Sequence, residues 1–166
     1  MIARGTRGLT ARALLVVCLL PLGAEAQDPE CARWRQAFTG MPLKMMTIQI
    51  GSRTLALRVR AADTPERQAG GFQCATPEEI HRNLILFDFG DEILTQFHMK
   101  NVRAPLDIAF IKADGRIFSI LKMEPSPTQL YGPMGTFRYA IEARAGFYES
   151  QGIRQGEARL VLPDAR

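Results

Sequence analysis

Apolar and polar residues alternate along several short stretches of the chain, which is the pattern of half-buried β-strands. The alternation is clearest in residues 54–60, where leucine or valine occupies every second position. This stretch follows the β-rich run 44–50 after Gly51 and Ser52. Two such runs separated by a two-residue turn that begins with glycine predict a β-hairpin.

Strand-like runs continue towards the end of the chain. The turn sequence Ala113-Asp114-Gly115 predicts a second hairpin. Three prolines and two glycines interrupt residues 123–136, so we expect this stretch to form a long loop. Beyond the first hairpin, strands are expected at residues 84–89, 93–99, 106–112, 116–121, 137–143 and 158–162.

Two short helices are predicted between the first hairpin and the later strands. Thr64-Pro65 and Thr76-Pro77 each place a capping residue before a proline, and glutamate follows in the first turn. Gly70-Gly71 ends the first of these helices. The predicted fold is therefore mainly β with short helices (α+β), a small, partly closed β-barrel of seven or eight strands with a helical flank.

Residues 1–26 have the layout of a secretory signal peptide. Three arginines precede an apolar stretch from Ala13 to Leu22, and Ala24-Glu25-Ala26 places small residues where a signal peptidase reads them. The alternative is a membrane anchor, but this stretch spans only about 15 Å as a helix, half of the hydrocarbon core. We therefore expect cleavage after Ala26, a periplasmic or secreted protein, and no membrane span after cleavage.

Cleavage would leave residues 27–43 as an N-terminal extension with a short helix, and residues 44–166 as a single domain. It would also change the charge balance. The whole chain has 21 Lys and Arg against 17 Asp and Glu, whereas loss of three arginines and Glu25 leaves 18 against 16. Without a basic run, this balance argues against a nucleic-acid partner.

Cleavage would also reduce the three cysteines to two, Cys31 and Cys74. An even number of cysteines in an exported chain favours a disulfide, and the alternative is a pair of unpaired thiols. No second Cys or His lies two to five residues from either, so the cysteines do not indicate a metal site. The sequence contains no cofactor motif, and we expect neither a metal nor a cofactor.

The densest polar cluster joins residues 96–101 to Asp107, which opens a later strand. If the two strands are neighbours, Lys100, Asn101 and Asp107 converge, with His98 near the end of the first strand. One interpretation is a ligand pocket in which Lys100 is the cation, Asn101 the amide donor and Asp107 the acceptor or base. A structural interpretation gives Asn101 a turn and Lys100 an ion pair with Asp107. A third treats His98 as an ordinary half-buried histidine.

This cluster resembles the signature of the domain-of-unknown-function 192 (DUF192) family, F-W-M-K-N-T followed by L-D-I-x-F-I. Here the first motif reads Phe97-His98-Met99-Lys100-Asn101-Val102 and the second spans residues 106–111. The resemblance covers about residues 55–162 and departs from the family pattern at three places. His98 replaces Trp, Phe72-Gln73 replace Leu-Met, and Leu84 replaces Gly. Further segments that resemble family motifs are 62–70, 84–87, 140–142 and 152–157.

The resemblance implies a small envelope protein with a compact β-rich fold and no established activity. The sequence has no catalytic-serine, metalloprotease or phosphate-binding motif. We therefore expect a non-catalytic envelope accessory or ligand-binding module, a monomer or small homo-oligomer whose partner is a small molecule or envelope component. The alternative is a hydrolase of envelope or extracellular polymers, with Asp107 or Glu142 as acid/base and Lys100 as charge stabiliser.

Overall fold

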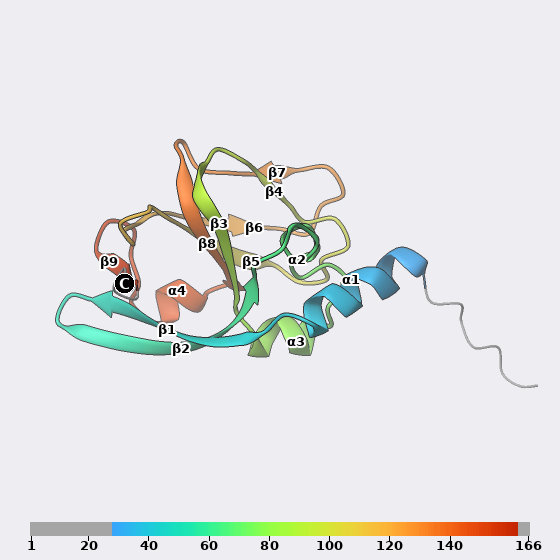
Figure 1. The fold of residues 1–166 in the computed structure, drawn as a ribbon, viewed down its shortest axis with the longest axis horizontal. Coiled ribbons are helices and arrows are strands. Elements are labelled where there is room, and N and C mark those ends of the chain that lie inside the picture. Colours follow the sequence, from blue (N-terminus) through green and yellow to red (C-terminus); the bar gives the residue numbers. More distant parts are fainter. Residues whose placement is uncertain (1–27, 163–166) are drawn as a thin grey trace, which may run out of the picture.

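The computed structural model describes residues 28–162, so the expected signal peptide at 1–26 lies outside the described residues. Within them, nine strands and four short helices follow one another along the chain (Figure 1). The helices are α1 (Pro29–Thr39), α2 (Pro65–Gly70), α3 (Pro77–Arg82) and α4 (Phe147–Ser150). The strands are β1 (Leu43–Ile50), β2 (Arg53–Ala62), β3 (Ile85–Ile93), β4 (Phe97–His98), β5 (Leu106–Ile111), β6 (Ile117–Met123), β7 (Leu130–Tyr131), β8 (Phe137–Arg144) and β9 (Ala158–Val161).

Seven of the described strands form one sheet in the order β6-β5-β8-β3-β2-β1-β9, and the sheet curls into a half-barrel (Figure 1). The pair β2–β3 is parallel, and the other pairs are antiparallel. The two edge strands approach each other through a bridge between Arg116 and Arg159, and Leu160 N–H donates to the Gly115 carbonyl at 2.8 Å. The predicted α+β class with a partly closed barrel is confirmed.

Two boundaries predicted from the sequence are wrong. Residues 93–99 do not form one strand, because β3 continues through Gly90-Asp91 to Ile93 and only Phe97–His98 is a strand beyond it. The register of the pairing between β3 and β8 shifts between Asp88 and Ile93, and this irregularity accommodates Gly90 within the strand. The loop predicted at 123–136 contains β7, which pairs with β4 as a separate two-stranded sheet.

The large sheet separates two buried apolar clusters. On the side of α4, residues such as Ile48, Ile141 and Tyr148 form one cluster. On the other side, the helices α1 to α3 cover a cluster that includes Phe38 and Phe72. Successive residues of a strand point to opposite faces, so neighbouring residues on β5 and β8 enter different clusters. This alternation decides where the candidate site residues lie.

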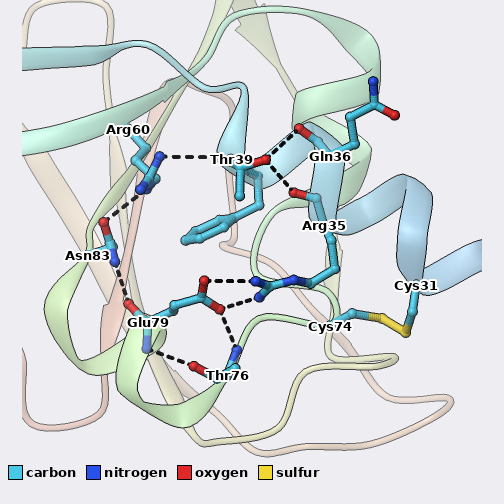
Figure 2. A network of polar contacts seen from close by, with 10 residues as sticks. Cys31, Arg35, Gln36, Thr39, Arg60, Cys74, Thr76, Glu79 and Asn83 are labelled. Atoms are coloured by element: carbon cyan, nitrogen blue, oxygen red, sulfur yellow. Dashed lines mark hydrogen bonds and ion pairs between the residues drawn. A yellow bond between two sulfur atoms is a disulfide. The ribbon is translucent and has the colours of Figure 1, made fainter. Parts of the chain in front are cut away.

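The helix α1 is fastened to the domain by covalent and polar contacts (Figure 2). Cys31 and Cys74 form a disulfide with a Cα–Cα distance of 5.5 Å, as the cysteine count favoured. Arg35 contacts both carboxylate oxygens of Glu79 on α3, with Nη2 to Oε1 at 3.0 Å. Glu79 also accepts a hydrogen bond from the Thr76 N–H at 2.8 Å, completing the capping box of α3. The disulfide holds α1 against the loop after α2, and the two contacts of Arg35 hold it against α3.

No helix among residues 28–162 has the length and apolar character needed to cross a membrane.

Candidate functional site

The structure does not bring the four predicted site residues together. Lys100 Nζ forms an exposed ion pair with Glu30 of α1, at 3.0 Å from Oε1. Asp107 is buried and makes no salt bridge with any residue between 28 and 162. The ion pair predicted between Lys100 and Asp107 therefore does not form. His98 and Asn101 lie in a third environment, near the loop after α2.

Asp107 faces the side of the sheet that α4 covers. It is 4% exposed and pairs across β5–β8 with Ala143, which belongs to the cluster on that side. Burial raises the pKa of Asp107, and the Lys122 charge and the N–H groups at the start of α4 oppose this rise. Those N–H groups belong to Gly146, Phe147 and Tyr148. The Oδ1 atom of Asp107 nevertheless has no hydrogen-bond partner among the described residues.

Glu142 lies on the opposite face of the same sheet. On β8 it is paired with Ile85 of β3 and with Ile108 of β5, so its side chain shares their face. Both isoleucines belong to the cluster beneath α1 to α3. Asp107 and Glu142 therefore cannot flank one substrate as a glycosidase pair, because the sheet lies between their side chains.

The Glu142 carboxyl is buried without compensation. The residue is 4% exposed, and its Oε2 atom has no hydrogen-bond partner among the described residues. Burial raises the pKa of Glu142 to about 8. A buried carboxyl without a counter-charge or donor destabilises the folded state, because its ionised form loses hydration. Such groups are more common at functional sites than elsewhere in a fold.

A cavity of about 140 Å³ adjoins this carboxyl. Exposed residues Gln96 and His98 belong to its lining, so the cavity reaches the surface. Gly71 lies beside Glu142 in the cavity wall, and its φ of +47° favours glycine. A Cβ at Gly71 would also lie 3.2 Å from Glu142 Oε2. The full lining is Gln68, Ala69, Gly70, Gly71, Phe72, Gln73, Phe87, Gln96, Phe97, His98, Val102 and Glu142.

Hydrogen bonds fix the buried side chain of Gln73 at the cavity. Its Nε2 donates to the Ala69 carbonyl at 2.8 Å, and its Oε1 accepts from Asn101 Nδ2 at 3.4 Å. The Asn101 carbonyl in turn accepts from the Cys74 N–H at 2.8 Å. Asn101 therefore positions Gln73, whereas His98 lines the cavity directly.

Gly71 and Gln73 were not singled out by the sequence analysis. Gly70-Gly71 was interpreted only as the end of a helix, and Gln73 was noted as a departure from the family pattern. The segments that resemble family motifs could nevertheless have pointed to this cavity. The cavity is assembled from four segments that carry the resemblance and are far apart in the chain, 62–70, 84–87, 97–102 and 140–142.

The chemistry available in this cavity is limited to one carboxyl, one imidazole and several amides. Its lining, all of it described, includes no Ser, Thr, Cys, Tyr or Lys that could act as a nucleophile. Within residues 28–162, no three His, Cys, Asp or Glu side chains group as metal ligands would. The arrangement is suited to hydrogen bonding and charge pairing with a small group, and to donating a proton.

A model of the DUF192 family, described as an uncharacterized ACR, matches residues 46–160. No curated protein matches the chain significantly.

Two solved structures are similar in fold. One is a candidate transcription regulator from Sinorhizobium meliloti, with 27% identity and a TM-score of 0.66 over 73% of this chain and 94% of that one. The other is a protein of unknown function from Novosphingobium aromaticivorans, with 22% identity and a TM-score of 0.66 over 75% of this chain and 88% of that one. The second similarity concerns the fold alone.

Proposed function

The chain belongs to the DUF192 family. We propose that it is an exported, non-catalytic protein that binds a small molecule in the cavity around Glu142. The observation that carries the proposal is the buried Glu142 carboxyl without a hydrogen-bond partner on Oε2. A ligand that pairs with this carboxyl would offset the destabilisation that its burial causes. The disulfide supports export, since disulfides persist in oxidising compartments.

We propose different roles for the candidate site residues, on the basis of their contacts. We propose that Glu142, Gln73 and His98 contact the ligand and that Asn101 holds Gln73 in place. Lys100 joins the turn after β4 to α1 through its exposed ion pair, and such pairs contribute little to stability. Asp107 serves the start of α4, on the other face of the sheet.

Binding can be tested with four small probes: ethylammonium, acetate, acetamide and ethanol. We expect at least one of them to shift the backbone amide resonances of Gly71 and Gln73 in a saturable way. Glu142→Gln should weaken that binding by tenfold or more, because it removes the carboxyl group that contacts the ligand. Asp107→Asn is the matched control, since it makes the same change at a buried position on the opposite face, and it should leave binding unchanged.

Two outcomes would contradict the proposal. The first is that no probe shifts resonances at the cavity. The second is that Asp107→Asn weakens binding as much as Glu142→Gln does, with both variants folded.

The second candidate function is hydrolysis with Glu142 as the general acid. It is favoured by the raised pKa of Glu142, about 8, since a carboxyl that stays protonated at neutral pH can give a proton to a leaving group. It is disfavoured by the lack of a nucleophile among the described residues that line the cavity. Turnover of an envelope polysaccharide or peptide that disappears in Glu142→Gln would favour this function over binding alone.

A further inference from the structure

The charges around the Glu142 cavity are unsuited to an anionic ligand. Among the described lining residues, Glu142 from β8 and His98 from β4 are the titratable ones, and no Lys or Arg contributes. A ligand carboxylate or phosphate would therefore find no Lys or Arg in the lining with which to pair. Tyr148 lies on the opposite face of the sheet, where its hydroxyl donates to the Ile141 carbonyl at 2.6 Å.

The apolar part of the cavity is aromatic. Phe87 and Phe97 both line it, with ring centroids 5.1 Å apart and planes at 88°. The same point in space, a Cβ built on Gly71, lies 3.6 Å from Phe87 Cζ and 3.2 Å from Glu142 Oε2. Glu142 Oε2 and the Phe87 ring therefore both lie close to Gly71 at the cavity wall, and aromatic rings attract cations.

The cavity is also small. Its volume of about 140 Å³ compares with about 30 Å³ for one water molecule in the liquid, so it holds roughly five heavy atoms. An ammonium group with a short aliphatic chain fits this volume.

We propose that the cavity binds the primary ammonium group of a small aliphatic amine, with the Glu142 carboxylate as its counter-ion. This inference rests on the proposed binding function and names its ligand class. An ammonium group has three N–H donors, which suit Glu142 and the Oε1 atom of Gln73, while the chain of the amine packs against the rings. Binding is accompanied by release of one proton from the Glu142 carboxyl to solvent at neutral pH, because burial raises its pKa to about 8.

Proton release gives binding a characteristic pH dependence. Ethylammonium is the probe, because an alkyl ammonium with a pKa near 10, as for lysine, stays charged across this range. Its affinity for the disulfide-bonded chain, measured by calorimetry from pH 6 to pH 9, should rise about tenfold per pH unit below pH 8 and level off above it. Acetamide, which would accept a hydrogen bond from the protonated carboxyl, should not show this rise.

Two variants test which residue causes the pH dependence of ethylammonium binding. Glu142→Gln should lower the affinity for ethylammonium at pH 8 by tenfold or more and abolish the rise with pH. His98→Gln should keep the rise, since His98 is the other titratable group at the cavity. If the rise instead survives in Glu142→Gln and disappears in His98→Gln, Glu142 is not the counter-ion and the inference is overturned.

The failure of this inference can be distinguished from failure of the binding function. If acetate or acetamide binds at the cavity and ethylammonium does not, the cavity is a ligand site of another class and only the amine inference is wrong. If none of the probes binds, both proposals are wrong.

Discussion

Breaking the Cys31–Cys74 disulfide is expected to lower the free energy of unfolding by about 4 kcal/mol. The bridge spans 43 residues of sequence, and closing a loop of this size restricts the unfolded chain strongly. The bridge also holds α1, since Cys31 lies on that helix and Cys74 on the loop after α2. Cys31→Ser should therefore lower the midpoint of thermal unfolding by roughly 10 °C or more.

The same change is expected to weaken ligand binding. Cys74 follows Gln73 directly, and its N–H donates to the Asn101 carbonyl. The Asn101 side chain in turn donates to Gln73, so the disulfide helps to hold Gln73 in place. Reductant added to the unmodified protein should reproduce both effects. Reductant added to Cys31→Ser is the control, and it should change neither. An unfolding midpoint that stays the same in Cys31→Ser would contradict the stabilising role of the bridge.

Replacing Glu142 by Gln is expected to stabilise the protein at pH 8 by several kcal/mol. The reference pKa of the carboxyl is 4.5, and the folded value is about 8. Below the reference value the carboxyl is protonated in both states, so its burial adds no dependence on pH. Between the two values the folded protein keeps a proton that the unfolded chain releases, and stability falls by up to about 1.4 kcal/mol per pH unit. Gln does not titrate, so the stability of Glu142→Gln does not fall in this way as the pH rises.

Chemical denaturation at pH 5 and at pH 8 measures this effect. The advantage of Glu142→Gln over the unmodified protein should be small at pH 5 and largest at pH 8. Glu149→Gln is the matched control, because Glu149 is exposed on α4, and its stability should follow that of the unmodified protein at both pH values. An advantage of Glu142→Gln that does not grow with pH would contradict the uncompensated burial of Glu142.

A gain in stability combined with a loss of binding would identify Glu142 as a residue retained for function. Proteins keep a destabilising group where that group has a task. Asp107 is also buried with a raised pKa, but the N–H groups of Gly146, Phe147 and Tyr148 oppose the rise. Each carboxyl has one buried oxygen without a hydrogen-bond partner among the described residues, Asp107 Oδ1 and Glu142 Oε2. They differ because nearby N–H groups and Lys122 lower the pKa of Asp107, whereas only burial acts on Glu142.

Turns and helix ends could be predicted from the sequence because they depend on residues that are neighbours in the chain. The hairpin at 44–60 and the helices after Thr64 and Thr76 have the turn and capping residues that the structure uses. The strand expected at 93–99 was wrong because pairing with β8 extends β3 through Gly90, and no local pattern reports such pairing.

The candidate site was less predictable than the fold, because it depends on which face of the sheet each side chain occupies. Residues close in sequence, Lys100 and Asn101, contact different parts of the molecule, α1 and Gln73. Asp107 was grouped with them on the assumption that two strands are neighbours, but its strand β5 pairs with β6 and β8. Glu142 was noted only as an alternative acid/base residue, since its burial depends on contacts made by distant segments.

The most direct test of this account is the titration of Glu142 itself, followed through the ¹³C resonance of its carboxyl carbon in the ligand-free protein. We expect a midpoint near pH 8, because the carboxyl is buried without a partner on Oε2. A midpoint near the ordinary value of 4.5 would show that the carboxyl is hydrated or paired, and would contradict its role as the centre of the binding cavity.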